Sequence, residues 1–456
     1  MAGARAQGAE RAAAAWYLCY FGALGTLLPF LAAGLREWGG FGEARVGELL
    51  AFQRWLTVLA SPAACWLADA SGRHRAVLAG CFAVSVATHA LMWPASTRGQ
   101  LAALTLLDGL FSTQVASIAD ALHITELGAG GFGRVRLWGA VGWGTAAGLT
   151  GLLARQVEAG LRAVIPANVA VSGLAAAAAC YLPFSPSASK ESSDNRGEGT
   201  SLAAVRRLFS IPELRAFYSL ALVTGSSTGV IDAYLGLYLQ DLGGSNLLLG
   251  LIMTCMCVGE IPVFYFAGRL IDRVGCVGVI HLAMLSYVVR LLLYFFLQWA
   301  PSPWLVLPVE LLHGFTFGGL WAASTEHLAR IAKREKHTPL LTTSVATFQC
   351  IHFGLGFGVG AFAGGFVYER HSAPAVFLLW AIIAAGGWGL FHVALRVIGA
   401  REITHQSDEE SRAGLGEIEL EGLLEENDEE SATAGGNEGR VGRPRRRSHD
   451  GGVADD

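Results

Sequence analysis

Charged residues are scarce in this chain. Only 15% of its 456 residues are Asp, Glu, Lys or Arg, whereas hydrophobic residues make up 53%. An ordinary soluble domain carries about a quarter charged residues, so this composition excludes a typical water-soluble globular protein. The charge is also uneven, because residues 401–456 hold sixteen acidic and seven basic side chains. The formal net charge of −4 therefore reflects this tail, and the rest of the chain is slightly basic.

The chain also lacks the patterns that hold metals, disulfides or nucleotides. Its eight cysteines are scattered through apolar stretches, and Cys255-x-Cys257 has no second pair to complete a zinc site, so we interpret them as buried thiols. The alternating glycines of 354–360 lie inside an apolar stretch with no preceding strand, which favours close helix packing over a nucleotide loop. No phosphate-binding loop is present. We expect no cofactor, no metal and no enzymatic activity.

Long apolar stretches are the dominant feature of the sequence. A bilayer core of about 30 Å needs about 20 mostly apolar residues per helix. Twelve segments meet this condition: 12–34, 46–67, 76–94, 101–122, 135–154, 162–182, 215–239, 247–267, 277–298, 303–328, 340–366 and 374–398. The sequence therefore predicts an all-α polytopic membrane protein with twelve transmembrane helices. A soluble protein with buried helices gives no reason for so many spans of this length.

The distribution of Lys and Arg predicts the orientation of these spans. If the N-terminus is cytosolic, the inner loops hold Arg73, Arg75, Arg134, Arg136, the basic residues of 190–215, Arg269, Arg273 and those of 330–336. The outer loops then hold only Arg36, Arg45, Arg98, Arg155, Arg162 and Arg370. Basic residues gather on the cytosolic side of membrane proteins. We therefore predict that both termini are cytosolic, in a plasma membrane or an endolysosomal or vacuolar membrane.

One polar segment divides the spans into two sets of six. Residues 184–213 are the only long polar interruption before the tail. We predict an N-terminal six-helix half (1–183), a cytosolic linker with an amphipathic helix (184–213), a C-terminal six-helix half (214–400) and a disordered cytosolic tail (401–456). Two pseudo-symmetric halves are a transporter architecture, with the substrate held near the midplane between them.

A short charged element occurs twice, 203 residues apart, after the second span of each half. Its glycines permit a tight turn between helices. Its aspartate can accept hydrogen bonds at a helix N-terminus, and its arginine can pair with an acid across the joint. Together with two arginines before the fifth span, these residues form a predicted cytosolic gate: Asp69, Gly72, Arg73, Arg134, Arg136, Gly268, Asp272, Arg273 and Gly275.

These motifs resemble a known family. The second copy, residues 268–275, resembles the signature of the major facilitator superfamily, whereas the first has Cys65 where the leading glycine is expected. Residues 132–142 resemble a run of the phenylpropionate permease and nucleoside–proton symporter-like branch, which the major facilitator domain-containing 6 proteins also carry; residues 310–321 are similar to that branch too. The resemblance implies a transporter for a small organic solute such as a nucleoside, an aromatic acid or a sugar.

Three ionisable side chains meet at one depth of the predicted membrane. Glu310 and His313 are one helical turn apart, and Arg290 lies at a matching depth on the preceding span. An ionisable group inside a bilayer costs about 2.5–3.5 kcal/mol, so each needs a partner or a purpose. We predict that this group holds a proton whose affinity changes with substrate. A permanently paired network that only orients helices is the alternative.

Other ionisable residues of the spans form a predicted substrate and charge network: Arg54, Asp108, Asp232, Glu260 and His352. For Arg54 and Asp108, a structural ion pair and a substrate contact are equally open. We interpret His89, His281 and His392 as satisfied structural histidines. Another set lies at the inner ends of two spans and is expected to face the gate arginines: Asp120, His123, Glu126, Glu326 and His327.

The sequence therefore predicts a secondary transporter that works by alternating access and is coupled to protons. Without an ATPase motif the energy must come from an ion gradient, and titratable groups in the spans favour protons over sodium. Its expected partners are a small organic solute, H⁺ and the lipid bilayer, with no nucleic acid. The alternative is a non-transporting receptor or scaffold on the same fold, although the short outer loops argue against a large binding face.

Overall fold

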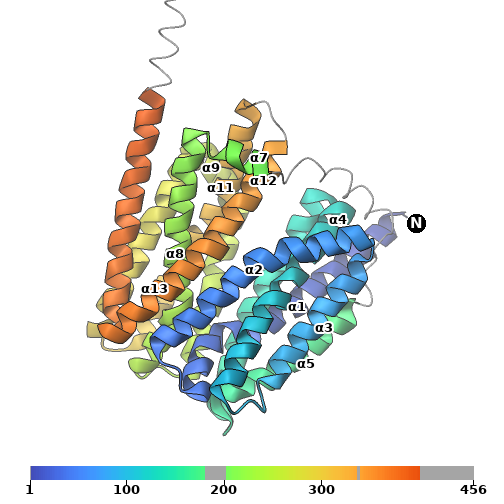
Figure 1. Cartoon of the computed structure of the whole chain (residues 1–456), viewed down its shortest axis with the longest axis vertical. Coiled ribbons are helices and arrows are strands. Elements are labelled where there is room, and N and C mark those ends of the chain that lie inside the picture. The colour runs from blue at the N-terminus through green and yellow to red at the C-terminus, as the bar shows by residue number, and fades with distance from the viewer. Residues whose placement is uncertain (1, 180–201, 336–338, 401–456) are drawn as a thin grey trace, which may run out of the picture. The chain divides into compact units, whose positions relative to one another are not determined.

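The computed structural model describes residues 2–179, 202–335 and 339–400 (Figure 1). Over these ranges every regular element is a helix and no strand occurs. Nine helices in the described ranges are long and apolar enough to cross a bilayer. The prediction of an all-α membrane protein is confirmed at this level. The predicted tail and residues 184–201 of the predicted linker lie outside the described residues.

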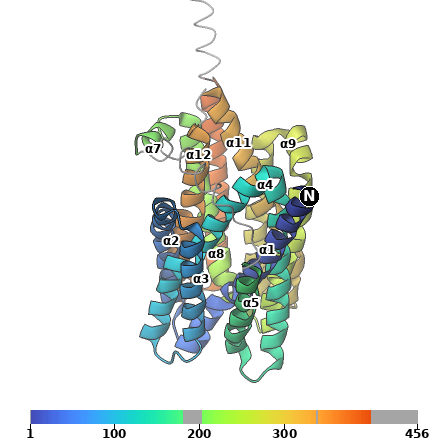
Figure 2. The same ribbon diagram turned by 90° about the vertical axis from the view of Figure 1, so that its right-hand side faces the viewer.

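The chain forms two units, Met1–Ala394 and Leu395–Asp456. The N-terminal group of the first unit comprises α1 (Ala2–Gly39), α2 (Glu43–Ser71), α3 (His74–Leu91), α4 (Arg98–Gln156), η1 (Gly160–Ala163) and α5 (Val164–Ala179). Glycines with positive φ end two of these helices, Gly40 at 59° after α1 and Gly72 at 62° after α2. Figure 2 shows α1, α3 and α5 running side by side.

The C-terminal group begins with α7 (Leu202–Leu208), which falls within the predicted amphipathic helix and exposes Arg206 and Arg207. The elements that follow are α8 (Pro212–Asp241), α9 (Asn246–Phe296), η2 (Leu297–Trp299), η3 (Pro303–Leu305), α10 (Val306–Glu310), η4 (Gly314–Gly319), α11 (Leu320–Arg334), α12 (Pro339–Gln349), η5 (Cys350–Gly356) and α13 (Phe357–Arg370). The last described helix is Ala373–Ala400. Residues 314–319 and 350–356 are wound as π-helix, which often marks functional sites.

Two of the long helices change direction within their length. In α4, the Arg136 Nε lies 3.8 Å from the Asp120 carboxylate. Sixteen residues of straight helix would separate these side chains by about 24 Å, so the chain doubles back between them. In α9, Gly275 leaves the helical region with φ 75° and ψ 163°. Each of the two helices therefore contains two of the stretches that the sequence predicts as separate spans.

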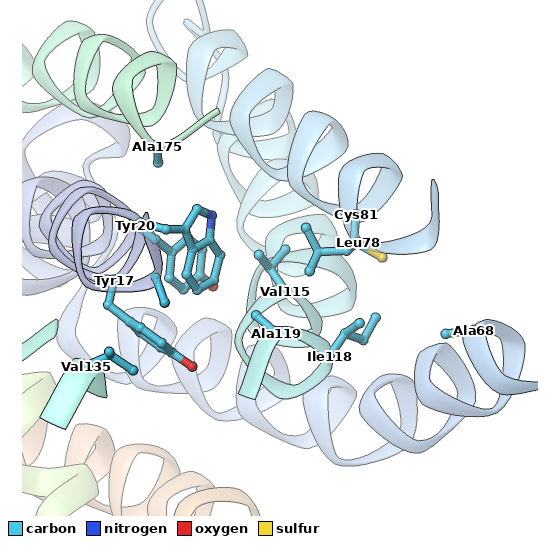
Figure 3. Close-up of a cluster of buried hydrophobic side chains, with 12 residues drawn as sticks. Tyr17, Tyr20, Ala68, Leu78, Cys81, Val115, Ile118, Ala119, Val135 and Ala175 are labelled. Atoms are coloured by element: carbon cyan, nitrogen blue, oxygen red, sulfur yellow. The ribbon is translucent and has the colours of Figure 1, made fainter. Parts of the chain in front are cut away.

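A cluster of buried aromatic and small side chains holds the N-terminal group together (Figure 3). Trp16 stacks on Tyr20 with ring centroids 4.8 Å apart, and both are 1% exposed. Tyr17 donates a 2.6 Å hydrogen bond from its hydroxyl to Asp120. Val115 and Ala119 of α4 pack beside these rings. The aromatic pair adds about 0.5–1.5 kcal/mol beyond its burial within α1. The Tyr17 hydrogen bond and the packing on Val115 and Ala119 fix α1 against α4.

The two groups touch through glycines. A Cβ on Gly47 of α2 would collide with the carbonyl of Ala361 in α13, and a Cβ on Gly250 of α9 would lie 3.1 Å from the Cα of Gly151 in α4. Within the C-terminal group, a Cβ on Gly360 would collide with the Ser226 carbonyl of α8. The alternating glycines of 354–360 therefore serve close helix packing, as interpreted from the sequence.

Candidate functional site

Among the charged side chains described in the C-terminal group, Arg290 of α9 makes the most complete set of hydrogen bonds. Its Nη2 donates to Glu310 Oε2 at 2.7 Å, and its Nε donates to the Tyr294 hydroxyl at 3.0 Å. That hydroxyl donates to Glu310 Oε1 at 2.6 Å and closes a ring of hydrogen bonds. Arg290 and Glu310 are 1% and 0% exposed. A buried ion pair is sustained only when its remaining hydrogen-bonding groups are also satisfied, and this ring satisfies them.

His313 joins the same network from the start of the π-helical segment. Its Nδ1 lies 3.3 Å from Arg290 Nη1, which also donates to Thr316 Oγ1 at 2.8 Å. A guanidinium has no acceptor, so Nδ1 must accept, and the imidazole is neutral with its proton on Nε2. The ring is only partly buried and stacks on Phe317 with centroids 5.4 Å apart. The structure thus brings together the three residues of the predicted proton-coupling group.

The N-terminal group holds its own buried acid, Asp108 of α4. His89 Nε2 lies 2.8 Å from Asp108 Oδ1, and Gln53 Nε2 donates to Oδ2 at 2.8 Å. The second nitrogen of His89 lies 3.0 Å from Asn168 Oδ1, and the Asn168 amide donates to the Ala23 carbonyl at 2.6 Å. This network ties α1, α2, α3, α4 and α5 together. His89 is satisfied, as interpreted, but it is the central partner of Asp108.

Arg54 and Asp108 do not form an ion pair, so that alternative of the sequence analysis is wrong. The carboxylate of Asp108 is already engaged by His89 and Gln53. Arg54 instead places its guanidinium 4.5 Å from the centroid of the Phe357 ring of α13. Its charge interacts with Asp108 and with Asp232 of α8, but among the described residues no ion pair forms with either.

Asp232 and Glu260 also face the region between the groups. Asp232 is exposed between the buried Ile231 and Ala233, and its charge interacts with Arg54 and Arg290. Glu260 of α9 is partly buried, and its charge interacts with Arg136 of α4. Within the described part of the chain, neither carboxylate accepts a hydrogen bond.

His352 differs from the other members of the predicted charge network. It is 3% exposed, and its Nδ1 lies 3.0 Å from the Thr224 hydroxyl of α8. Its ring stands edge-on to Phe353 with centroids 4.6 Å apart. These contacts make it a packed histidine at the junction of α8 and η5.

Residues of the predicted cytosolic gate make their described contacts within their own group. Arg134 donates to Glu10 at 2.5 Å, and Arg136 packs 4.0 Å from the Phe21 ring centroid beside Asp120. Asp272 and Arg273 are exposed. Positive φ angles place Gly72 and Gly275 at turns, whereas a Cβ on Gly268 would meet nothing within 4 Å. The other residues are Arg73, whose backbone N donates to Ser71, and Asp69, whose side chain lies outside the described set.

A connection between the groups that the sequence analysis missed lies where α1 and α8 end. Arg36 donates to Asp241 Oδ1 and to Gln240 Oε1, both at 2.8 Å. Tyr368 of α13 donates to the other oxygen of Asp241 at 2.5 Å. We name Arg36, Gln240, Asp241 and Tyr368 the end latch. The sequence could have indicated this contact, since Arg36 and Asp241 carry opposite charges and each lies near the predicted outer end of a span.

Comparison with known proteins places the chain among membrane transporters. The family model described as "MFS_1 like family" matches residues 12–379. The chain is 24% identical to the uncharacterized transporter YwbF of Bacillus subtilis, covering 86% of this chain and 94% of that protein. It is 26% identical to the maltose permease of Geobacillus stearothermophilus, covering 82% of this chain and 91% of that protein.

A shorter match and a solved structure agree with this placement. The human major facilitator superfamily domain-containing protein 6-like is 29% identical over 180 residues, 37% of this chain and 29% of that protein. The crystal structure of the nucleoside transporter NupG in its D323A mutant form superposes with a TM-score of 0.72 over 84% of this chain and 99% of that chain, at 15% identity. At this identity the likeness concerns the fold alone.

Proposed function

Because the chain belongs to the MFS_1 like family of membrane transporters, we propose that it moves a small organic solute by alternating access, driven by protons. The observation that carries the proposal is the Arg290–Glu310–Tyr294 ring with the partly exposed His313 beside it. This arrangement holds one acid whose charge is balanced by a single fixed cation, next to a titratable ring that is partly exposed.

The proposal includes twelve spans in two halves, with residues 1–183 and 214–400 as the halves. The reversal within α4 and the break at Gly275 in α9 support this count, because each separates two apolar stretches of spanning length. Helix α2 supplies another helix of 29 residues, long enough to cross a bilayer. The sequence orientation then puts both termini and the linker in the cytosol.

In this orientation the end latch lies on the outer side. Arg36 and Asp241 tie α1 to α8 there, and the Ala44 amide of α2 donates to Glu369 of α13 at 3.2 Å. The predicted gate residues on the cytosolic side hold no comparable contact between the halves in the described chain. We therefore infer that this conformation is closed on the outer side of the membrane. Alternating access then requires the end latch to open while the cytosolic side closes.

Proton coupling follows from the bonding of Glu310. While ionised, its two oxygens accept from Arg290 and Tyr294. When Glu310 takes up a proton, its attraction for Arg290 weakens, and the guanidinium is free to interact with Asp232, whose charge it already feels. His313 is the group through which a proton reaches this buried ring, since its neutral imidazole can bind one and release one.

Transport in proteoliposomes tests this proposal. Counterflow is measured for a panel that includes maltose, uridine and amino acids, and acid-driven uptake is then measured for each solute that exchanges. We expect Glu310→Gln to abolish uphill uptake while exchange continues. Normal uphill uptake in this variant would contradict the proton role. No exchange of any solute by the wild-type protein would contradict the transporter proposal and favour the receptor alternative.

The matched control for Glu310→Gln is Glu48→Gln. Glu48 lies on α2, outside the buried ring, and among the described residues its one ion-pair partner is Arg45, one turn away. This variant also removes one acidic charge, so a general charge effect would lower uptake in both proteins. Uphill uptake is expected to stay at the wild-type level in Glu48→Gln.

A further inference from the structure

Two opposite charges between the helix groups, Arg54 and Asp232, have no hydrogen-bond or ion-pair partner among the residues that the structure describes. Arg54 carries five N–H donors, and none of them reaches an acceptor in the described chain. Asp232 accepts no hydrogen bond there, although it lies within a 30-residue apolar helix, nine residues before the helix ends at Asp241. The charges of Arg54 and Asp232 interact with each other, yet the two side chains form no ion pair. Charges within a bilayer are costly, so such a pair of groups calls for a ligand that completes it.

Neighbouring charges cannot supply the missing partners without loss. The Asp108 carboxylate is held by His89 and Gln53, and Glu310 is held by Arg290 and Tyr294. Moving either acid toward Arg54 would leave its present hydrogen-bond donors buried and unpaired, which is unfavourable. Among the described charges between the groups, Arg54, Asp232 and Glu260 therefore remain available to a solute, and Arg54 and Asp232 are the oppositely charged two whose charges interact with each other.

The surroundings of Arg54 are aromatic. Its guanidinium lies over the Phe357 ring, and Phe353 lies one helical turn before Phe357 on the same helix face. Phe353 packs against Trp321 and Phe317, with ring centroids 5.8 Å and 6.2 Å away. These three rings are only partly buried. They form an aromatic wall that runs from Arg54 toward His313, which stacks on Phe317.

We propose that the transported solute is a small zwitterion with an aromatic or apolar body, comparable to an aromatic amino acid. Its carboxylate pairs with Arg54 of one half, its ammonium group pairs with Asp232 of the other, and its body lies on the wall of Phe317, Trp321 and Phe353. Binding then links α2 to α8 through the solute, which supplies the energy that draws the halves together. This inference rests on the proposed transport function.

A set of three related probes tests the two charges separately. Phenylalanine carries both groups, 2-phenylethylamine lacks the carboxylate, and 3-phenylpropionate lacks the ammonium group. Binding to the purified full chain in nanodiscs is measured by thermal shift and by isothermal titration, with maltose and uridine as probes of other chemical classes. We expect phenylalanine to bind about tenfold or more tightly than either singly charged probe, because a charge-assisted hydrogen bond contributes that much.

Substitutions assign each charge to its group on the solute. Arg54→Gln should remove the preference for phenylalanine over 2-phenylethylamine, while Arg54→Lys keeps part of it. Asp232→Asn should remove the preference for phenylalanine over 3-phenylpropionate. Arg45→Gln is the matched control, because Arg45 is an exposed arginine of the same helix, paired only with Glu48. It should leave both preferences unchanged.

Three results would overturn the inference. Equal losses for all three probes in Arg54→Gln and Asp232→Asn would mean that the two residues pair with each other rather than with the solute. Unaltered preferences in both variants, with wild-type thermal unfolding, would exclude them from the site. Counterflow of maltose or uridine but not of phenylalanine would refute the zwitterion and leave the proposed transport function intact. An absence of counterflow for every solute would instead refute that function.

Discussion

Each helix group buries one acid between two consecutive helices, and the two acids are held in different ways. In the N-terminal group, Asp108 pairs with His89, nineteen residues earlier, across the turn between α3 and α4. In the C-terminal group, Glu310 pairs with Arg290, twenty residues earlier, across the turn after α9. The near-equal spacing suits a duplicated architecture. The bonding does not, because Asp108 has partners on both α2 and α3 (Gln53, Ser85 and His89), whereas the described donors of Glu310, Arg290 and Tyr294, both lie on α9.

Under the proposed function, this difference separates a pair that only orients helices from a pair that exchanges a proton. The network of Asp108 extends through His89 to Asn168 and to the backbone of α1, so it joins five helices and holds no exposed member. The network of Glu310 ends at His313, whose ring is partly exposed beside a π-helical segment. A network closed on itself orients helices. One that ends at a titratable and accessible ring can exchange a proton.

The largest expected effect comes from breaking the C-terminal pair. Arg290→Met leaves Glu310 buried beside no cation, and removing one partner of a buried pair costs about 3–5 kcal/mol. The free energy of unfolding, measured by thermal and denaturant unfolding in nanodiscs, should fall by this amount. The double variant Arg290→Met with Glu310→Met should recover most of it, since no charge then remains buried. A double variant as unstable as the single one would show that packing, rather than charge, is lost.

The corresponding change in the N-terminal group should cost less. His89→Leu removes one partner of Asp108, but Gln53 still donates to it and the Ser85 hydroxyl lies 3.3 Å away. Loss of one hydrogen bond to a charged group costs about 1–3 kcal/mol. Unfolding measured as for Arg290→Met checks the order of the two effects. A larger loss for His89→Leu than for Arg290→Met would contradict the distinction between the pairs.

Helix content and the C-terminal pair were accessible from the sequence because both depend on local properties. Apolar length predicts a spanning helix wherever it occurs, and Glu310 and His313 lie one turn apart on any helix. The proximity of Arg290 to Glu310 and His313 could be predicted from its depth in the membrane alone, because only a short turn separates its helix from the helix that carries them. The π-helical winding at 314–319 was not predicted, because the apolar pattern of span 303–328 does not distinguish π-helix from α-helix.

The pairing of Asp108 with His89 was not predicted, for a physical reason. Helices that are apolar on all faces have no polar stripe from which their rotation about the helix axis can be inferred. Membrane depth alone therefore suggested Arg54 as a neighbour of Asp108, whereas the rotation of the helices turns Asp108 toward His89. The end latch was missed because Arg36 and Asp241 are 205 residues apart and pair only through the packing of α1 on α8. Contacts of this kind depend on tertiary arrangement, which charge counts along the chain do not encode.

Two glycines in the second copy of the repeated element differ in what they require of the backbone. Gly275 has φ 75° and ψ 163°, a region that essentially only glycine occupies, and Gly268 of the same element lies where a Cβ would meet nothing. Gly275→Ala should therefore lower the free energy of unfolding by about 1–3 kcal/mol, whereas Gly268→Ala should be neutral or slightly stabilising. Thermal unfolding of both variants checks this. Equal stability of the two would show that the backbone at 275 relaxes without cost.

The smallest expected effect concerns the end latch. The proposed alternating access requires the contact between Arg36 and Asp241 to break easily, so it should contribute little stability. Arg36 and Asp241 have side chains 24% and 45% exposed, and a pair in such surroundings contributes about 0–1 kcal/mol. Arg36→Gln should therefore shift the balance toward opening at this end by up to about fivefold. Spin–spin distances between labels on unnatural amino acids at Ser96 and Ser372, exposed residues at the ends of the two groups, measure the shift. Arg98→Gln is the control, because Arg98 bonds only the carbonyls of Gly39 and Gly40 within its own group. An equal shift in both variants would assign the effect to charge at this end of the molecule instead of to the bond between α1 and α8.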